Sequence, residues 1–206
     1  MNIIIVGCGN TGSRLANTLD EKGYDVAVID INKNSFRLLS ENFSGLCICG
    51  TATDVETLKN AGCDNADMAV VVTDSDNVNI MVAKVLDFEF SIDNTFVRVS
   101  DPSREAVFRK LGLKTVSPTR IESNIFLSLL TDDTDTEQSI TLNQSTVRFT
   151  TVKAEKKHKD MLPSEIPCKS GEMLFAIRKK DGSLHFTNEA HLYIDQGDKL
   201  IYAKMS

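Results

Sequence analysis

The residues best suited to bind a ligand are three glycines near the start of the chain. Residues 7–12 read G-C-G-N-T-G and follow a short apolar, β-branched run over residues 3–6. A G-x-G-x-x-G pattern between a strand and a helix is the fingerprint of a dinucleotide-binding βαβ unit. In such a unit Gly7 makes the turn out of the strand, Gly9 lets the backbone approach a phosphate, and Gly12 lets helix and strand pack closely. The phosphates then lie on unpaired N–H groups at the helix N-terminus.

An acidic residue follows where such a unit binds a ribose. A second predicted strand over residues 25–29 ends at Asp30, which lies 18 residues after Gly12. A carboxylate at this place can accept hydrogen bonds from both ribose hydroxyls of an adenosine. Its charge also repels a 2′-phosphate, so we expect NAD rather than NADP. The alternative interpretation of Asp30 is a solvated acid at the end of a strand.

Composition and charge narrow the class of protein. The chain has 206 residues, of which 41% are hydrophobic and 25% charged, as in ordinary soluble globular proteins. Its net charge of −6 argues against a nucleic-acid partner, because phosphate backbones are bound by basic surfaces. No stretch approaches the roughly 20 apolar residues of a membrane span, and no signal-peptide pattern is visible. We therefore expect a cytoplasmic protein.

The thiols and imidazoles do not group into a catalytic or metal site in the sequence. The cysteines are odd in number and scattered through apolar segments, so we expect buried thiols rather than zinc ligands. The histidines all lie late in the chain, and none has a neighbouring acid and nucleophile. We predict no catalytic residue and no metal ligand. The residues concerned are Cys8, Cys47, Cys49, Cys63 and Cys168, and His158, His185 and His191.

Hydrophobic runs and helical periodicity alternate over residues 1–131. Short strands are predicted at residues 3–6, 25–29, 45–49, 68–72, 95–99 and 114–116. Helices are predicted between the strands at residues 13–22, 35–42, 54–61 and 103–111. A further helix is predicted to follow residue 77 and to end near residue 88, and the last begins at residue 118. This alternation predicts an α/β fold: a Rossmann-like, doubly wound parallel sheet of about six strands.

The character of the sequence changes near residue 131. Residues 132–144 are predicted to be a linker, because their first part is acidic and has no periodicity. Short strands follow at residues 146–152, 173–178, 184–187 and 200–203, and Asp181-Gly182 is a hairpin signal between two of them. Residues 145–206 are therefore predicted to form a second, small β-rich module.

Several further segments match one protein family. In the N-terminal part they read G-T-A-T at residues 50–53 and A-V-V-V-T at 69–73, followed by Asp76 and Asn79. V-R-V-S-D-P at 97–102 and V-S-P at 116–118 follow. In the C-terminal part they read F-A-I-R at 175–178 and Q-G-D-K-L at 196–200. Together with the glycine motif and Asp30, they resemble the RCK (or KTN) regulatory subunits of bacterial Trk and Ktr potassium uptake systems, the TrkA family. The resemblance implies an RCK N-terminal Rossmann domain followed by a small α+β C-terminal RCK module.

The places of these residues in the chain agree with the binding site that the resemblance implies. Thr51, Thr73 and Asp74 follow predicted strands, whose carboxyl ends form the ligand-binding edge of such a sheet. Thr53 is placed to contact adenine or its ribose. Arg98 ends the fifth strand, where a guanidinium reaches either a phosphate or an acid across a subunit contact, or forms an ordinary surface ion pair. The predicted binding residues are Gly7, Gly9, Asn10, Thr11, Gly12, Asp30, Thr51, Ala52, Thr53, Thr73, Asp74 and Arg98.

Two departures from the Ktr branch favour one class of ligand. Asn10 stands where Ktr proteins often carry an arginine that reaches the terminal phosphate of ATP. Thr119 stands where they often carry a glutamate that binds a divalent cation. These differences favour NAD or NADH, as in the Trk branch, or ADP-type ligands over ATP with a divalent cation. NAD or NADH is the ligand that we expect, and ATP or ADP is the alternative. Thr51 replaces the family's aspartate and leaves the orientation of the ligand open.

The rest of the chain indicates a sensor rather than an enzyme. A nicotinamide dehydrogenase needs a second domain that presents an acid or base to the nicotinamide, and the β-rich module is too small for this. We predict a regulatory nucleotide-binding subunit that gates a membrane potassium channel or transporter by rearrangement of an RCK oligomer. The alternatives are a small NAD-dependent oxidoreductase and an RCK regulator of a different ion transporter.

The resemblance also implies partners and a location. We expect a TrkH- or KtrB-like potassium-translocating subunit in the membrane, and further copies of this chain in a dimer or ring. The protein would then attach peripherally to the inner face of the cell membrane through that subunit. The predicted helix from Pro118 either packs against a partner copy or covers the sheet of its own domain.

Overall fold

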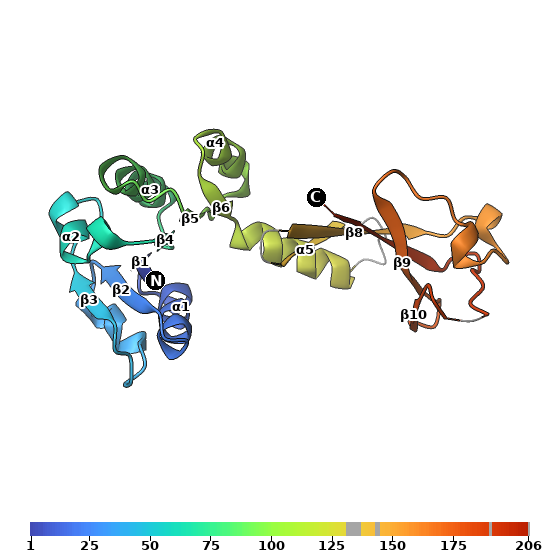
Figure 1. The fold of residues 1–206 in the computed structure, drawn as a ribbon, viewed down its shortest axis with the longest axis horizontal. Helices are drawn as coiled ribbons and strands as arrows, with labels where there is room; N and C mark the ends of the chain where they lie inside the picture. Colours follow the sequence, from blue (N-terminus) through green and yellow to red (C-terminus); the bar gives the residue numbers. More distant parts are fainter. Residues whose placement is uncertain (131–136, 143–144, 190, 206) are drawn as a thin grey trace. The chain divides into compact units, whose positions relative to one another are not determined.

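The protein is described by a computed structural model that covers residues 1–130, 137–142, 145–189 and 191–205. The chain divides into two compact units, Met1–Asn124 and Ile125–Ser206 (Figure 1). Strands and helices alternate in the N-terminal unit, whereas the C-terminal unit is mainly antiparallel sheet. Helix α5 (Pro118–Leu130) crosses the boundary between the units.

The N-terminal unit is built on a six-stranded parallel sheet. Its strand order is β3-β2-β1-β4-β5-β6, so the order of the strands reverses between β1 and β4. This is the order of a doubly wound Rossmann sheet, and it confirms the predicted fold class. The strands are β1 (Asn2–Val6), β2 (Asp25–Asp30), β3 (Leu46–Cys49), β4 (Met68–Val71), β5 (Thr95–Arg98) and β6 (Lys114–Val116).

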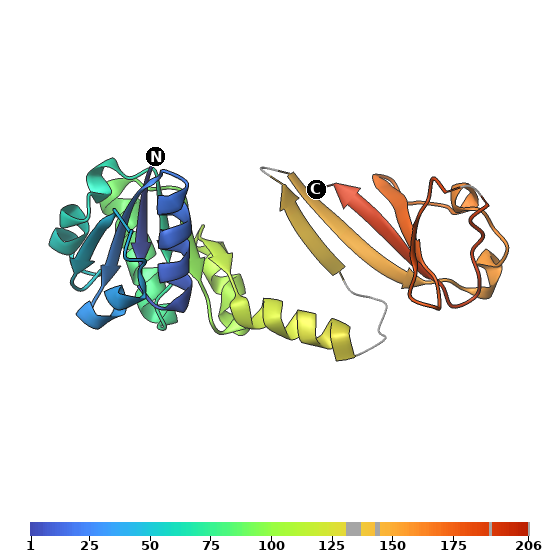
Figure 2. The ribbon, with the colours of Figure 1, turned by 90° about the horizontal axis from the view of Figure 1, so that it is seen from below.

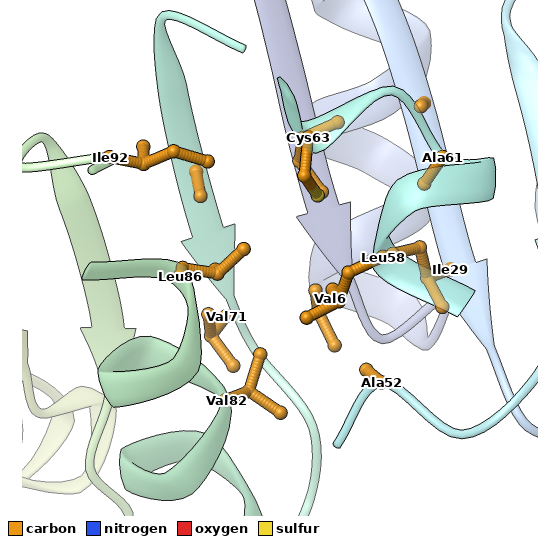
Figure 3. Close-up of a cluster of buried hydrophobic side chains, with 13 residues drawn as sticks. Val6, Ile29, Ala52, Leu58, Ala61, Cys63, Val71, Val82, Leu86 and Ile92 are labelled. Atoms are coloured by element: carbon orange, nitrogen blue, oxygen red, sulfur yellow. The ribbon is translucent and has the colours of Figure 1, made fainter. Parts of the chain in front are cut away.

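The central strands are buried on both faces. Alternate residues of a strand point to opposite faces, so Val6 packs with Leu58 of α2 (Val55–Asn60) and Val82 of α3 (Asp76–Phe90) on one face (Figure 3). Ile5 packs with Ala16 of α1 (Asn10–Glu21) on the other face. This double coverage explains why β1 is apolar at successive positions rather than alternately polar.

The helices of the N-terminal unit lie close to the predicted segments, with two corrections. Helix α1 begins at Asn10, three residues before the predicted start, because its N-cap Gly9 makes no side-chain capping bond that the sequence could reveal. The predicted helix at residues 35–42 is instead a short 3₁₀ helix, η1. The elements are α1 (Asn10–Glu21), η1 (Lys33–Leu38), α2 (Val55–Asn60), η2 (Cys63–Asn65), α3 (Asp76–Phe90), η3 (Pro102–Arg104) and α4 (Glu105–Lys110).

The C-terminal unit contains a five-stranded antiparallel sheet, seen in orange to red in Figure 2. The strand order is β10-β9-β11-β8-β7, and one face packs on a core that includes Ile177, Ile194 and Leu200. The predicted turn at Asp181-Gly182 joins β9 to β10, with Gly182 at a φ of +89°. The elements are β7 (Glu137–Leu142), β8 (Ser145–Lys153), η4 (Lys156–His158), η5 (Pro163–Glu165), β9 (Glu172–Arg178), β10 (Leu184–Phe186) and β11 (Lys199–Met205).

The segment predicted as a linker is only partly described. Residues 131–136 and 143–144 lie outside the described residues. Within the predicted linker, Glu137–Leu142 form β7, which pairs with β8. No strand is predicted there from the sequence, although Ile140 and Leu142 alternate with polar residues. The domain boundaries at residues 131 and 145 stay predictions.

Candidate functional site

Loops at one edge of the parallel sheet surround a cavity of about 910 Å³. The cavity lies at the carboxyl ends of β1 to β5, across the point where the strand order reverses, and this is where doubly wound sheets bind ligands. All the predicted binding residues except Gly12 line it. These are Gly7, Gly9, Asn10, Thr11, Asp30, Thr51, Ala52, Thr53, Thr73, Asp74 and Arg98.

The three glycines of the motif differ in what surrounds them. Gly7 has a φ of +99°, which suits the sharp turn out of β1. A Cβ atom on Gly12 would lie 1.8 Å from the carbonyl oxygen of Gly7, so the start of α1 can approach the turn only because residue 12 is glycine. A Cβ atom on Gly9 would meet no atom within 4 Å, so its backbone is open where it lines the cavity.

Asp30 holds the glycine loop in place as well as lining the cavity. Its Oδ2 accepts the backbone N–H of Cys8 at 2.7 Å, and its Oδ1 accepts that of Asn32 at 2.8 Å. Each carboxylate oxygen retains a second acceptor position. Asp30 can therefore accept hydrogen bonds from ribose hydroxyls while it fixes the loop. The second of these roles is not predicted from the sequence.

The thiol inside the glycine motif is part of the core. Cys8 is fully buried, and its Sγ donates a weak hydrogen bond to the carbonyl oxygen of Ser35 at 3.5 Å. Burial raises the pKa of this thiol to about 11, with further contributions from the charges of Asp30 and Cys47. Cys8 therefore stays protonated at neutral pH and contacts η1 through the carbonyl oxygen of Ser35.

Two buried polar residues fix the ends of β4 and β5. The side chain of Asn79 accepts the backbone N–H of Thr73 at 3.1 Å and donates to the carbonyl oxygens of Thr73 and Arg98, at 3.1 and 3.0 Å. Asp76 accepts the backbone N–H groups of Ser100 and Asp101, at 2.7 and 3.2 Å. Because buried polar groups require such partners, both residues determine where the strand ends lie.

Arg98 is the one basic residue among the described residues that line the cavity. Its Nη1 lies 3.4 Å from Oδ1 of Asp74, a side chain that is fully exposed. Its Nε is buried and has no hydrogen-bond partner within the described part of the chain. An ion pair with so exposed an acid contributes little stability, so the guanidinium can exchange Asp74 for an anionic ligand at low cost.

Part of the cavity wall is apolar, and its residues are absent from the predicted binding residues. Ile31, Leu38 and Val78 line the cavity and are 75%, 50% and 37% exposed. Ile31 follows the strand-end Asp30 directly, and this position is the only signal that the sequence offers for it. The side chains of Leu38 and Val78 reach the cavity because η1 and the start of α3 face it, which strand and helix prediction does not show.

The prediction of buried thiols is only partly correct. Cys8 and Cys63 are buried, but Cys47, Cys49 and Cys168 are exposed. Cys47 and Cys49 belong to β3, which is the edge strand of the sheet and has a neighbour only on one side. The sequence does not reveal which strand is at the edge, and an apolar segment there is covered less completely.

The statement that no histidine has a neighbouring acid and nucleophile is wrong for His185. Its Nε2 lies 3.0 Å from Ser183 Oγ, and its Nδ1 lies 2.7 Å from a carboxylate oxygen of Glu189. Ser183 Oγ also donates to Asp181 at 2.6 Å, so its one proton is already engaged with a carboxylate. This group holds the β9–β10 hairpin of the C-terminal unit, whereas the cavity belongs to the N-terminal unit.

The described residues contain neither a metal-binding cluster nor a membrane-spanning helix. Among them, no three or more His, Cys, Asp or Glu side chains gather as they would around a metal ion. Nor does any helix in the described ranges have the length and apolar character of a membrane span.

Comparison with known proteins assigns the family. The TrkA-N domain family matches residues 3–118, which include the glycine motif, Asp30 and the other strand-end residues of the cavity. The chain belongs to the TrkA-N family. This confirms the resemblance found in the sequence. The cavity lies within the part of the chain that the family covers.

Two curated relatives are named as TrkA proteins. The Trk system potassium uptake protein TrkA of Streptomyces coelicolor is 41% identical over 120 residues, which are 58% of this chain and 54% of that protein. The TrkA homolog of Pyrococcus abyssi is 32% identical over 221 aligned positions, which cover 100% of this chain and 93% of that protein. This chain therefore matches about half of one TrkA relative and nearly all of another.

A solved structure shares the fold over both units. The match to the GsuK channel bound to NAD covers 100% of this TrkA-N chain and 37% of the GsuK chain, with a TM-score of 0.61 and 16% sequence identity. At this identity the likeness concerns the fold alone. It agrees with the predicted organisation of a Rossmann-like domain followed by a small β-rich module.

Proposed function

We propose that this TrkA-N protein is a nucleotide-sensing regulatory subunit that gates a membrane potassium channel or transporter. The observation that carries the proposal is the cavity at the carboxyl edge of the parallel sheet, where the glycine loop, Asp30 and Arg98 meet. A ligand that fits one arrangement of the subunits better than another shifts the equilibrium between them. Binding without chemistry is sufficient for this role.

NAD or NADH is the ligand that we favour. The N-terminus of α1 and Arg98 offer positive potential for phosphates, and Asp30 offers acceptors for ribose hydroxyls. Ile31, Leu38 and Val78 provide apolar surface for a flat ring. The fold relative GsuK is described with NAD bound. ATP or ADP is the alternative ligand, since it shares the adenosine and the phosphates with NAD.

Self-association is part of the proposal. Helix α5 carries Phe126, Leu129 and Leu130, which are 63%, 76% and 82% exposed. Exposed apolar side chains in such density indicate an interaction surface, and a second copy of α5 is the partner that we propose. A dimer of this kind, repeated in a ring, would hold the nucleotide sites in a shared assembly below a TrkH- or KtrB-like membrane subunit. In this arrangement the protein is cytoplasmic and peripheral to the membrane.

The nucleotide site is tested by titration calorimetry of the whole protein with NADH, NAD, ATP, ADP and NADPH. We expect NADH or NAD to bind most tightly and NADPH to be rejected. Asp30→Asn should weaken NADH binding about tenfold, by analogy with the loss of a charged hydrogen bond, and should relax the rejection of NADPH. Asp25→Asn is the matched control, because Asp25 is an exposed acid at the opposite end of the same strand.

Two results would contradict this proposal. If none of the five nucleotides binds, the sensing role fails. If NADH binds and is oxidised with turnover in the presence of small carbonyl substrates, the protein is an oxidoreductase. Co-purification with a co-expressed potassium-translocating membrane subunit, rather than with another ion transporter, tests the partner.

A further inference from the structure

Charge is distributed unequally along the chain. Residues 145–206 contain eleven Lys and Arg against eight Asp and Glu, whereas residues 1–144 contain twelve against twenty-one. This excess is local, because the whole C-terminal unit, Ile125–Ser206, contains eleven Lys and Arg against twelve Asp and Glu. Where cations gather on one face within the unit, they indicate an anionic partner for that face.

Strand pairing concentrates part of this charge in a row. Lys199 of β11 lies opposite Lys153 of β8 on one side and opposite Arg178 of β9 on the other. Directly paired residues project from the same face of an antiparallel sheet, so these three cations lie abreast. We call Lys153, Lys199 and Arg178 the basic row. An anion that lies against the exposed ends of the row, Lys153 and Arg178, would be attracted by both cations.

Two acids near the row already have cationic partners. Glu155 pairs with Lys157 at 3.1 Å, and the buried Asp198 pairs with Lys179 at 2.8 Å. Lys153 and Arg178 are exposed and have no ion-pair partner within the described part of the chain. A hollow of about 490 Å³, lined in part by Lys153 and Lys180, lies at this end of the sheet.

An apolar band lies beside the basic row on the same face. The ring of Phe175 contacts the rings of Phe149 and Phe186 edge-on, with centroids 5.3 and 5.5 Å apart. Leu184 pairs with Arg178 across β9 and β10, and both Leu184 and Phe186 are 50% exposed. The opposite face of the sheet is the one that packs on the core of the unit.

We propose that this face of the C-terminal sheet docks directly on an anionic phospholipid surface. The basic row would meet lipid phosphates, and Leu184 and Phe186 would enter the boundary between headgroups and acyl chains, as apolar side chains do in interfacial proteins. A small inorganic anion would have no use for the apolar band. The contact is additional to any attachment through a protein partner.

The test is co-sedimentation of the whole protein with vesicles. We expect binding to phosphatidylcholine vesicles that contain phosphatidylglycerol, little binding to phosphatidylcholine alone, and loss of binding at high salt. The double variant Lys153→Gln/Arg178→Gln should lower the affinity for the anionic vesicles about 30-fold. Lys22→Gln/Lys59→Gln removes the same charge from exposed positions of the N-terminal unit and should leave vesicle binding unchanged.

A second variant separates a lipid surface from a soluble ligand. Leu184→Ser should weaken binding to the anionic vesicles while it leaves the salt dependence in place. The proposal is overturned if the wild-type protein ignores anionic vesicles, or if the two double variants bind them equally. It is also overturned if soluble tripolyphosphate binds the same residues as tightly as the vesicles do, or if Lys153→Gln/Arg178→Gln changes the oligomeric mass in light scattering, which would assign the face to a second copy.

Discussion

The two units use their buried polar groups differently. In the N-terminal unit, Asn79 and Asp76 accept backbone N–H groups at the ends of neighbouring parallel strands, beside the cavity. In the C-terminal unit, the buried Asp198 accepts from the ammonium of Lys179 and from a backbone N–H of its own loop. All strands of a parallel sheet end at one edge, so polar residues there can shape a site. In an antiparallel sheet the ends alternate, and the polar residues hold local loops together.

The largest effect is expected from breaking the polar pair of the C-terminal unit. In Lys179→Met the carboxylate of Asp198, whose side chain is 2% exposed, loses its ammonium partner. Removing one member of a buried ion pair costs about 3–5 kcal/mol, because the other charge remains buried. Hydrogen–deuterium exchange should show faster opening of β9 and β11, with the N-terminal sheet unchanged.

Lys180→Met is the matched control for this comparison. Lys180 is the next residue, is exposed and forms no ion pair within the described residues. Its replacement should leave exchange in β9 and β11 close to that of the wild-type protein. Equal protection in the two variants would show that the C-terminal unit does not depend on its buried pair.

A smaller effect, confined to the N-terminal unit, is expected from Gly12→Ala. The new Cβ atom would lie 1.8 Å from the carbonyl oxygen of Gly7, so α1 must move away from the turn after β1. Overpacking of this kind costs about 3 kcal/mol, which thermal unfolding followed by circular dichroism should detect.

Gly9→Ala is the control that separates packing from binding. At Gly9 a Cβ atom meets nothing within 4 Å, so the fold should keep its wild-type stability. The same methyl group would stand where a phosphate approaches the backbone, and NADH affinity should fall. A Gly9→Ala variant that binds NADH normally would place the ligand away from the glycine loop.

The sequence predicts the N-terminal unit well because each of its signals is local. The β-branched runs and the glycine spacing each act within a few residues, and the structure has the six strands of the sheet close to where they were expected. The signals that failed depend on neighbours distant in the chain. The exposure of Cys47 follows from β3 being at the edge, and the contact of His185 with Glu189 follows from the turn after β10. The cavity residues Leu38 and Val78 likewise depend on where η1 and α3 lie.

The smallest effect is the dependence of stability on alkaline pH, which we expect to differ between the two units. In the N-terminal unit burial raises the pKa of Cys63 from 9.0 to about 12, with a further contribution from the charge of Asp64, and the pKa of Cys8 is raised to about 11. The folded chain therefore holds these protons more tightly than the unfolded chain. Their contribution to stability is complete below pH 9 and is lost as the pH rises toward 11–12.

At pH 10, one unit above the ordinary thiol pKa of 9.0, this loss amounts to about 1.4 kcal/mol for each thiol. In the C-terminal unit burial raises the pKa of Tyr202 above its ordinary value of 10.0. The contribution of Tyr202 to stability therefore begins to be lost about one pH unit higher than that of the thiols. Denaturant unfolding between pH 8 and 10 should thus show a decline that Cys63→Ala reduces and that Cys168→Ala, at an exposed position of the C-terminal unit, leaves unchanged. If Cys63→Ala declines as steeply as the wild-type protein, the alkaline sensitivity does not come from the buried thiol of Cys63.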